Sequence, residues 1–284
     1  VAMRLFVAGV TQGHLEECRL VSTAVIAEVG AARGSTARGE SRNNRDRIRS
    51  MNEFSSAIGA ALSMIVTFDT ALVEIVLLSL QVSLSAVAIA SIVALPLGAL
   101  IALQQFPGRR AVVILLNALM GLPPVVVGLM VYLLLSRAGP LGPMGLLFTP
   151  TAMVIAQSII VLPIIAALSR QTIADLHEEY DEHLRSLGCT PIQSVATLLW
   201  DGRFRLLTAI MAGFGRAIAE VGAVIIVGGN IQHATRVMTT TIALETSKGN
   251  LALALGLGLI LVTLALGVNA TALVISDAAR QRYG

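Results

Sequence analysis

The chain has 284 residues, of which 55% are hydrophobic and only 13% charged, and its formal net charge is +3. This is too little charge to cover the surface of an ordinary soluble globule, so the composition excludes that class and indicates a membrane protein. The small basic excess comes mostly from an arginine-rich N-terminal segment, so it indicates no nucleic-acid partner for the rest of the chain.

Residues 1–50 differ from everything that follows them. They contain eight arginines and no apolar run longer than LFVAGV, which is too short for the hydrophobic region of a secretory signal. We expect an unstructured, non-native extension, translated upstream of a working start at Met51. The alternative is a basic arm that contacts anionic lipid or RNA. Residues 51–284 are then the membrane domain.

Long intervals of the membrane domain lack any charged residue, and each exceeds the roughly 20 residues that a helix needs to cross a bilayer. A spanning segment must satisfy its own backbone hydrogen bonds in lipid, so these segments are predicted to be helices. The predicted fold class is an all-α integral membrane protein. Five spans are expected, at about residues 71–104, 112–135, 152–168, 206–227 and 251–275.

The first two of these spans contain prolines. Pro96 allows a kink in the first span. Pro123 and Pro124 fall in the second, where they free backbone carbonyls that neighbouring helices or water must satisfy. We interpret this pair as a packing kink or, alternatively, as a gating hinge.

The distribution of basic residues predicts the orientation, because Lys and Arg are enriched in cytoplasmic loops near span ends. If the long polar connection at residues 169–205 is cytoplasmic, eight basic residues and the C-terminus lie on that side, and three basic residues lie on the other. The arginines of residues 1–50 would then lie on the wrong side. The eight are Arg109, Arg110, Arg170, Arg185, Arg203, Arg205, Arg280 and Arg282, and the three are Arg137, Arg236 and Lys248.

The sequence lacks motifs for nucleotide binding and covalent catalysis. The only lysine, Lys248, lies in TSKGN without the glycine-rich loop that cradles phosphates, so P-loop binding of ATP is excluded. The segment HEEYDEH departs from the zinc-protease pattern at Asp181. Cys18 and Cys189 fall on opposite sides of the membrane in the predicted topology, so no disulfide is expected. We expect no catalytic residue, metal or cofactor on this chain.

The polar connection contains the spacing EHLRSLG, in which Glu182 precedes Gly188 by six residues. This resembles the cytoplasmic EAA-type loop of ABC importer permeases, whose pattern is E-A-A, three residues and G. The run GFGRAIAEVGAVIIVGGNI at residues 213–231 resembles the segment after that loop in permeases for molybdate, sulfate and tungstate, most of all the tungstate type. Similar runs are GLPPVVVGL at 121–129, GPLGPMGLLFTPTAM at 139–153 and TRVMTTTIALETSKGN at 235–250, so the resemblance covers about residues 70–276.

The turn at Gly188 is the predicted docking surface. Gly188 and Pro191 are expected to end one helix and begin another, with Leu and Ile at near-helical spacing around them. The resemblance implies that this turn is the coupling helix that docks into a separate ATPase, in the helix-in-groove manner. A plain connecting loop is the alternative. The residues assigned to the docking surface are Glu182, His183, Leu184, Gly188 and Pro191, although His183 and Leu184 replace two alanines of the family pattern.

Arg216 and Glu220 lie inside the fourth span, where each ionised side chain costs about 2.5 to 3.5 kcal/mol. Their spacing puts them on one helix face, where each partly neutralises the other. We expect either an ion pair that holds helices or two subunits together, or groups that line the translocation pathway. Hydroxyls and amides would suit a dianion that must pass quickly. Such candidates, for the pathway or for helix packing, are Asn117, Gln157, Ser158, Asn230, Thr239, Thr240 and Thr241.

By resemblance, the chain is the transmembrane subunit of a type I ABC importer for tungstate or a close oxyanion, in the inner (cell) membrane of a bacterium or archaeon. The resemblance implies an ABC ATPase dimer, an extracytoplasmic oxyanion-binding protein and a second copy of the chain as partners, within the lipid bilayer. A molybdate or sulfate permease is the alternative in the same class. From other classes, the alternatives are a membrane-embedded enzyme using Glu220, Arg216 and a histidine, and a secondary transporter, which often has inverted repeats.

Overall fold

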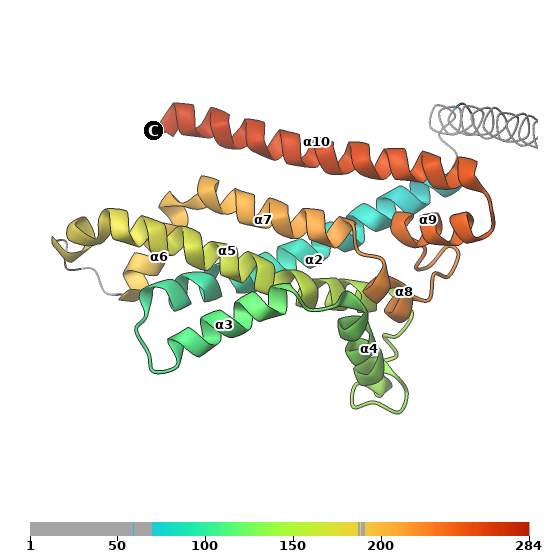
Figure 1. Ribbon diagram of the computed structural model, residues 1–284, viewed down its shortest axis with the longest axis horizontal. Helices are drawn as coiled ribbons and strands as arrows, with labels where there is room; N and C mark the ends of the chain where they lie inside the picture. Colours follow the sequence, from blue (N-terminus) through green and yellow to red (C-terminus); the bar gives the residue numbers. More distant parts are fainter. Residues whose placement is uncertain (1–58, 60–69, 187, 189–190, 284) are drawn as a thin grey trace, which may run out of the picture. The chain divides into compact units, whose positions relative to one another are not determined.

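The computed structural model describes residue 59, residues 70–186, residue 188 and residues 191–283, so the expectations for residues 1–50 lie outside it. The described residues belong to a unit that spans residues 58–284. Every regular element in the described ranges is helical, which confirms the all-α fold (Figure 1). The elements are α2 (Thr70–Leu103), α3 (Arg109–Met120), α4 (Pro124–Leu135), the 3-10 turn η1 (Gly142–Met144), α5 (Pro150–Ser186), α6 (Pro191–Asp201), α7 (Arg203–Ile218), α8 (Gly222–Gly228), α9 (Met238–Ser247) and α10 (Leu251–Tyr283).

The pairing of α2 with α5 forms the centre of this unit. The two backbones approach closely at Gly98, where a Cβ atom would lie 2.5 Å from the carbonyl oxygen of Ala166. Small residues permit such close approach of membrane helices. Two side chains of α5 donate hydrogen bonds across the contact: the Ser158 hydroxyl to the Ala86 carbonyl at 3.2 Å and the Ser169 hydroxyl to the Leu95 carbonyl at 3.1 Å. These contacts make α2 and α5 a tightly packed pair.

Three described helical segments are long and apolar enough to cross a membrane alone, namely Leu72–Leu103, Pro150–Glu182 and Leu251–Ile275. Two further spans are bent pairs, α3 with α4 at 98° and α7 with α8 at 59°. The predicted total of five spans therefore holds only if each bent pair counts as one span. The prediction of one helix over residues 206–227 is wrong, because that span is interrupted between Ile218 and Gly222.

The kink predicted at Pro123 and Pro124 is a break between two helices that meet at 98°. Helix α3 ends at Met120 and α4 begins at Pro124. The residue before a proline is forced out of the helical region, and Pro123 accordingly has φ −62° and ψ 122°. Pro124 then takes the first position of α4, where its missing N–H is not needed. The two prolines therefore end one helix and start another.

Helix α5 continues far beyond the predicted end of the third span at residue 168. It runs through the polar segment to Ser186 because apolar side chains keep recurring on one face. Ile173 and Leu176 are buried against Val195 and Leu198 of α6. The segment at residues 169–186, expected to be a connection, is therefore a helical extension of the span.

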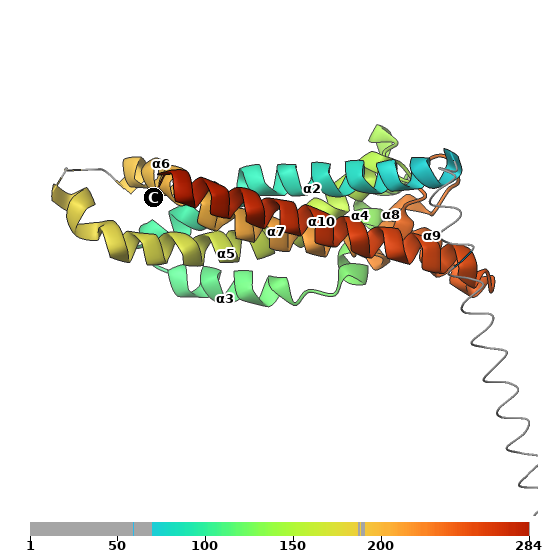
Figure 2. The same cartoon turned by 90° about the horizontal axis from the view of Figure 1, so that it is seen from above.

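The ends of the helices gather as the basic residues predict. The α2–α3 turn, α6 and the C-terminal end of α10 lie at one end of the bundle (Figures 1 and 2). We call this the α6 end. At the opposite end, the loop between α8 and α9 returns to the start of α2, where the Met238 N–H donates to the Ser79 hydroxyl at 2.7 Å. We call this the α9 end. That the α6 end faces the cytoplasm remains a prediction.

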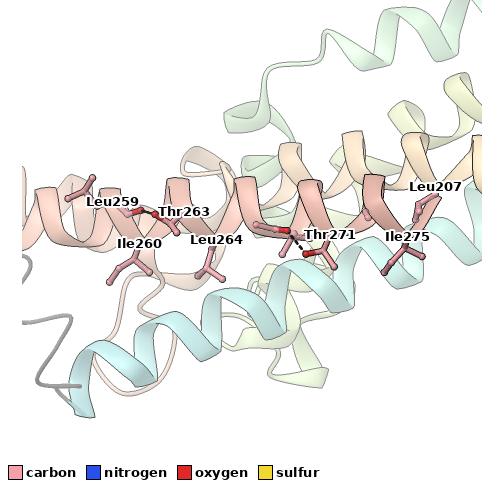
Figure 3. A pocket seen from close by; sticks show the side chains of 10 residues that line it. Leu207, Leu259, Ile260, Thr263, Leu264, Thr271 and Ile275 are labelled. Carbon is pink, nitrogen blue, oxygen red and sulfur yellow. Dashed lines mark hydrogen bonds between the residues drawn. The ribbon is translucent and has the colours of Figure 1, made fainter. Parts of the chain in front are cut away.

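A groove of ≈ 840 Å³ lies beside α10 (Figure 3). Its lining includes Leu207 of α7 and, on α10, Leu259, Leu264 and Ile275. The Thr263 hydroxyl donates to the Leu259 carbonyl at 2.7 Å within α10, so it offers no free donor to the groove. Since only 17% of the α10 span is buried, against 56% of the α5 span, α10 presents an apolar surface suited to the membrane interior.

Candidate functional site

The interruption between α7 and α8 places charged side chains inside the bundle. The Glu220 side chain is only 3% exposed, and its Oε2 accepts a hydrogen bond from Arg216 Nη1 at 2.6 Å. Its Oε1 accepts from the Ala223 N–H at 3.1 Å, which satisfies one of the free N–H groups at the start of α8. The structure thus brings the predicted pair together, but across the end of α7 and not along one continuous helix.

Two neighbouring helices hold the backbone at the end of α7 and within the interruption. From α5, Gln157 Nε2 donates to the Ala217 carbonyl at 3.2 Å. From α9, the Thr239 hydroxyl donates to the Glu220 carbonyl at 2.9 Å. Both side chains are buried. We call the three residues Ala219, Glu220 and Val221, together with these hydrogen bonds, the α7–α8 joint.

Asn230 and Thr240, two further pathway candidates, lie at the α9 end, whereas Asn117 is exposed on α3 and Ser158 bonds to α2. Thr240 is fully buried and its hydroxyl lies 3.0 Å from Asn230 Oδ1. Asn230 has a φ of 50°, a left-handed conformation that Asn tolerates better than most residues. The Thr240 hydroxyl also accepts from the Val237 N–H at 3.2 Å, at the start of α9. These contacts indicate that Asn230 and Thr240 hold the loop between α8 and α9 in position.

Glu245 is a buried acidic residue that the sequence motifs do not predict. Its side chain is 10% exposed, and its carboxylate accepts from Lys248 Nζ at 2.8 Å and from Asn250 Nδ2 at 3.1 Å. The hydrogen bond from Lys248 does most to hold the pKa of Glu245 below its ordinary value, against the opposing effect of burial. The signal available in the sequence was the three-residue spacing of Glu245 and Lys248, which is that of helix neighbours.

The predicted docking residues lie at the α6 end. Helix α5 ends at Ser186 and α6 begins at Pro191, as expected, and Gly188 between them has a φ of 65°. Only glycine adopts this left-handed region without strain. Glu182 is exposed on the last turns of α5. The backbones of His183, Leu184 and Pro191 are helical, and their side chains lie outside the described part of the structure.

Helix α6 has two distinct faces. Ser194, Val195 and Leu198 are buried against the bundle. The opposite face is exposed and ends in Trp200, which is 72% exposed. The members of this exposed face are Gln193, Ala196, Thr197 and Trp200. An exposed tryptophan on a short amphipathic helix next to a glycine turn is a surface that a partner protein can cover.

His177 and His233 each lie near an acidic side chain. No group of three or more His, Cys, Asp or Glu side chains that could hold a metal ion occurs among the described residues. The His177 Nε2 lies 3.7 Å from Asp181 and the His233 Nδ1 lies 2.9 Å from Glu74, so each has an acidic partner other than Glu220.

Comparison with known proteins decides the family. Residues 94–282 match the family described as "Binding-protein-dependent transport system inner membrane component". The chain belongs to this family. It is therefore a membrane-embedded permease subunit of the type I ABC fold, and the multi-pass arrangement of its helices agrees with that assignment.

Relatives of the permease include proteins named for anion transport. A probable anion ABC transporter permease protein of Haloferax volcanii is 40% identical over 76% of this chain and 95% of its own length. A tungstate uptake system permease protein of Peptoclostridium acidaminophilum is 40% identical over 70% of this chain and 88% of its own length. A sulfate transport system permease protein of Synechocystis is 32% identical over 45% of this chain and 47% of its own length.

Proposed function

We propose that this permease is the transmembrane subunit of an ATP-driven tungstate importer. The observation that carries the proposal is the 40% identity to a tungstate uptake permease over 88% of that protein. The sulfate permease is less similar and aligns with less than half of the chain, so sulfate is the second candidate substrate. Molybdate, as a close oxyanion, is the remaining alternative.

ATP hydrolysis takes place on a separate ATPase, because the sequence has no phosphate-binding loop. The ATPase docks at the α6 end, on the Gly188 turn and the exposed face of α6. The concentration of basic residues at this end supports its cytoplasmic position. The α9 end then faces outward and receives the anion from a binding protein.

A second copy of the chain completes the pathway. The Arg216 side chain is 32% exposed although it belongs to a bent span. Exposing a cation to lipid within a span costs too much free energy, so this guanidinium borders water or another protein surface. The buried Glu220 holds the half-buried guanidinium in place and neutralises much of its charge, so the pair is suited to a contact between subunits.

Reconstitution with the ATPase and the loaded binding protein tests this proposal. We expect ATP-dependent uptake of tungstate into vesicles. Sulfate should compete with this uptake only weakly, and molybdate is the one ion expected to compete strongly. Uptake by the chain alone would indicate a secondary transporter. Preferential uptake of sulfate would reassign the substrate and leave the ABC mechanism standing.

A matched pair of substitutions at Gly188 tests the docking assignment. No described atom lies within 4 Å of the position that a Cβ would take there, so the backbone conformation alone limits substitution. Asn tolerates the left-handed conformation and Val does not. Gly188→Asn should therefore keep most coupled transport and Gly188→Val should lose most of it, while both insert into the membrane. Full transport by Gly188→Val would show that the turn is no docking element.

A further inference from the structure

Helix α5 physically connects the docking turn with the α7–α8 joint. It runs from Pro150 to Ser186, so it carries Gln157 near one end and Glu182 near the other. At about 1.5 Å per residue, these two side chains are attached roughly 37 Å apart along the helix axis. A displacement of the α6 end of α5 therefore has a direct route to the joint.

Close-packed contacts lie on both sides of the joint. On one side, α7 packs against α5 at Gly213, where a Cβ would lie 2.7 Å from Ile165 Cδ1. On the other side, α8 packs against α4 at Gly128, where a Cβ would lie 2.6 Å from the Ala223 Cα, and also against α5 at Gly228, where a Cβ would lie 2.9 Å from the Met153 Sδ. Close-packed contacts resist gradual deformation. A change in the angle between α7 and α8 is therefore concentrated in the short segment between Ile218 and Gly222.

Gln157 contacts the joint with only half of its amide. Its Nε2 donates to the Ala217 carbonyl, whereas its buried Oε1 has no hydrogen-bond partner among the described residues. The side chain lines a small cavity of ≈ 10 Å³ together with the hydroxyls of Ser79, Ser83 and Thr239. A buried acceptor without a partner is costly. The Ser79 and Thr239 hydroxyls already donate to the Ile75 and Glu220 carbonyls, so this amide gains another bond only if a shift of the helices frees one of them.

We propose that Gln157 is a positioning residue that links the position of α5 to the angle between α7 and α8. Thr239 is its counterpart from α9, because its bond to the Glu220 carbonyl holds the other side of the joint. This inference rests on the proposed transport function, in which movement begins at the docking turn. Gln157 acts through the backbone of α7 and does not contact the transported anion.

The decisive variant is Gln157→Met, which keeps a similar shape and removes both polar groups. We expect tungstate transported per ATP hydrolysed to fall about fivefold, the factor that corresponds to the loss of one ordinary hydrogen bond. ATP hydrolysis without binding protein should continue. The ratio is the readout, because a purely structural defect would lower the amount of folded complex and leave the ratio unchanged.

Ser169→Ala is the matched control. Ser169 is a buried residue of the same helix, and its hydroxyl bonds to the Leu95 carbonyl of α2, away from the joint. We expect the transport-to-hydrolysis ratio of this variant to equal that of the wild type. An equal loss in Ser169→Ala, or an unchanged ratio in Gln157→Met, would overturn the assignment.

A second pair keeps the test valid if Gln157→Met does not fold. Thr239→Val removes the bond to the Glu220 carbonyl, and Thr239→Ser retains a hydroxyl. The Val variant should lose coupling and the Ser variant should restore most of it; equal ratios in the two would contradict the proposal. If the wild-type complex itself shows no ATP-dependent uptake, the proposed function fails and this inference fails with it. If the wild type and the variants all couple transport to ATP hydrolysis equally well, only the role of Gln157 is refuted.

Discussion

Helix α5 and the α7–α8 pair differ in a way that their prolines do not explain. Helix α5 contains Pro163 and still continues from Pro150 to Ser186. The α7–α8 pair has no proline at its interruption, yet its two helices meet at 59°. Proline content alone therefore does not decide whether a span is continuous.

Side chains around the two regions bond to different backbone groups. Along α5, the neighbouring α2 helix lies in close contact and receives bonds from Ser158 and Ser169. At the α7–α8 joint, side chains of Gln157, Thr239 and Glu220 take up backbone groups that a continuous helix would satisfy itself. In lipid an unsatisfied backbone group costs several kcal/mol, so an interruption persists only where such partners exist.

The strongest test of the joint is Arg216→Ala. It leaves the carboxylate of Glu220, which is 3% exposed, without its cation. Removing one partner of a buried ion pair costs about 3–5 kcal/mol. We expect the purified variant to unfold in detergent at a clearly lower denaturant concentration than the wild type.

Adding Glu220→Gln to Arg216→Ala should recover most of this loss, because the neutral amide can still accept from the Ala223 N–H. A loss below about 1 kcal/mol in Arg216→Ala alone would mean that Glu220 is well solvated. The interruption would then be maintained by water and not by neighbouring side chains.

The continuity of α5 is tested through its contact with α2. Gly98→Ala places a Cβ 2.5 Å from the Ala166 carbonyl oxygen, which forces the two backbones apart. Such overpacking costs about 1–3 kcal/mol. Gly258→Ala in α10 is the control, because no described atom lies within 4 Å of the added Cβ. It should be neutral or stabilising by up to about 1 kcal/mol. Equal effects on unfolding would show that the α2–α5 contact is looser than described.

Hydropathy predicted the bounds of the first and fifth spans well, because both are long stretches without charge. It placed the end of the third span at Leu168, where polar residues begin, and missed the continuing helix that Ile173 and Leu176 stabilise by packing on α6. The turn at Gly188 was predictable from local spacing and from the family pattern.

The α7–α8 joint was not predictable from local sequence. Arg216 and Glu220 were recognisable as a pair, but the bonds that hold the joint come from Gln157 and Thr239, which lie 60 and 19 residues from their acceptors. Only the tertiary arrangement brings these groups together. In contrast, the end of α3 was signalled by Pro123 and Pro124, whose steric effect is local.

Helix α9 supplies Thr239, so loosening α9 should weaken the joint indirectly. Glu245 fixes the end of α9 to Lys248 and Asn250. Glu245→Gln should lower the free energy of unfolding by about 1–2 kcal/mol at pH 7.

Because the pKa of Glu245 in the folded protein lies below its ordinary value of 4.5, the carboxylate stabilises the fold above that pH and the contribution is lost as pH falls through the folded pKa. Unfolding of both proteins measured from pH 7 downward should therefore converge in acid; a constant difference would exclude the ionised carboxylate as its cause.

The smallest effect is expected for Pro163→Ala. Alanine restores an N–H to α5 and has a higher helix propensity than proline, yet the helix is already continuous and held by α2 on both sides of this position. Stability should change by less than about 1 kcal/mol, since tertiary packing already fixes the path of α5. Transport per ATP should stay at the wild-type value, because a straight α5 transmits displacement from the docking turn at least as well as one with a proline. A large loss of transport with unchanged stability would instead locate the moving point at Pro163, within α5, and would show that this helix does not act as a rigid connection to the α7–α8 joint.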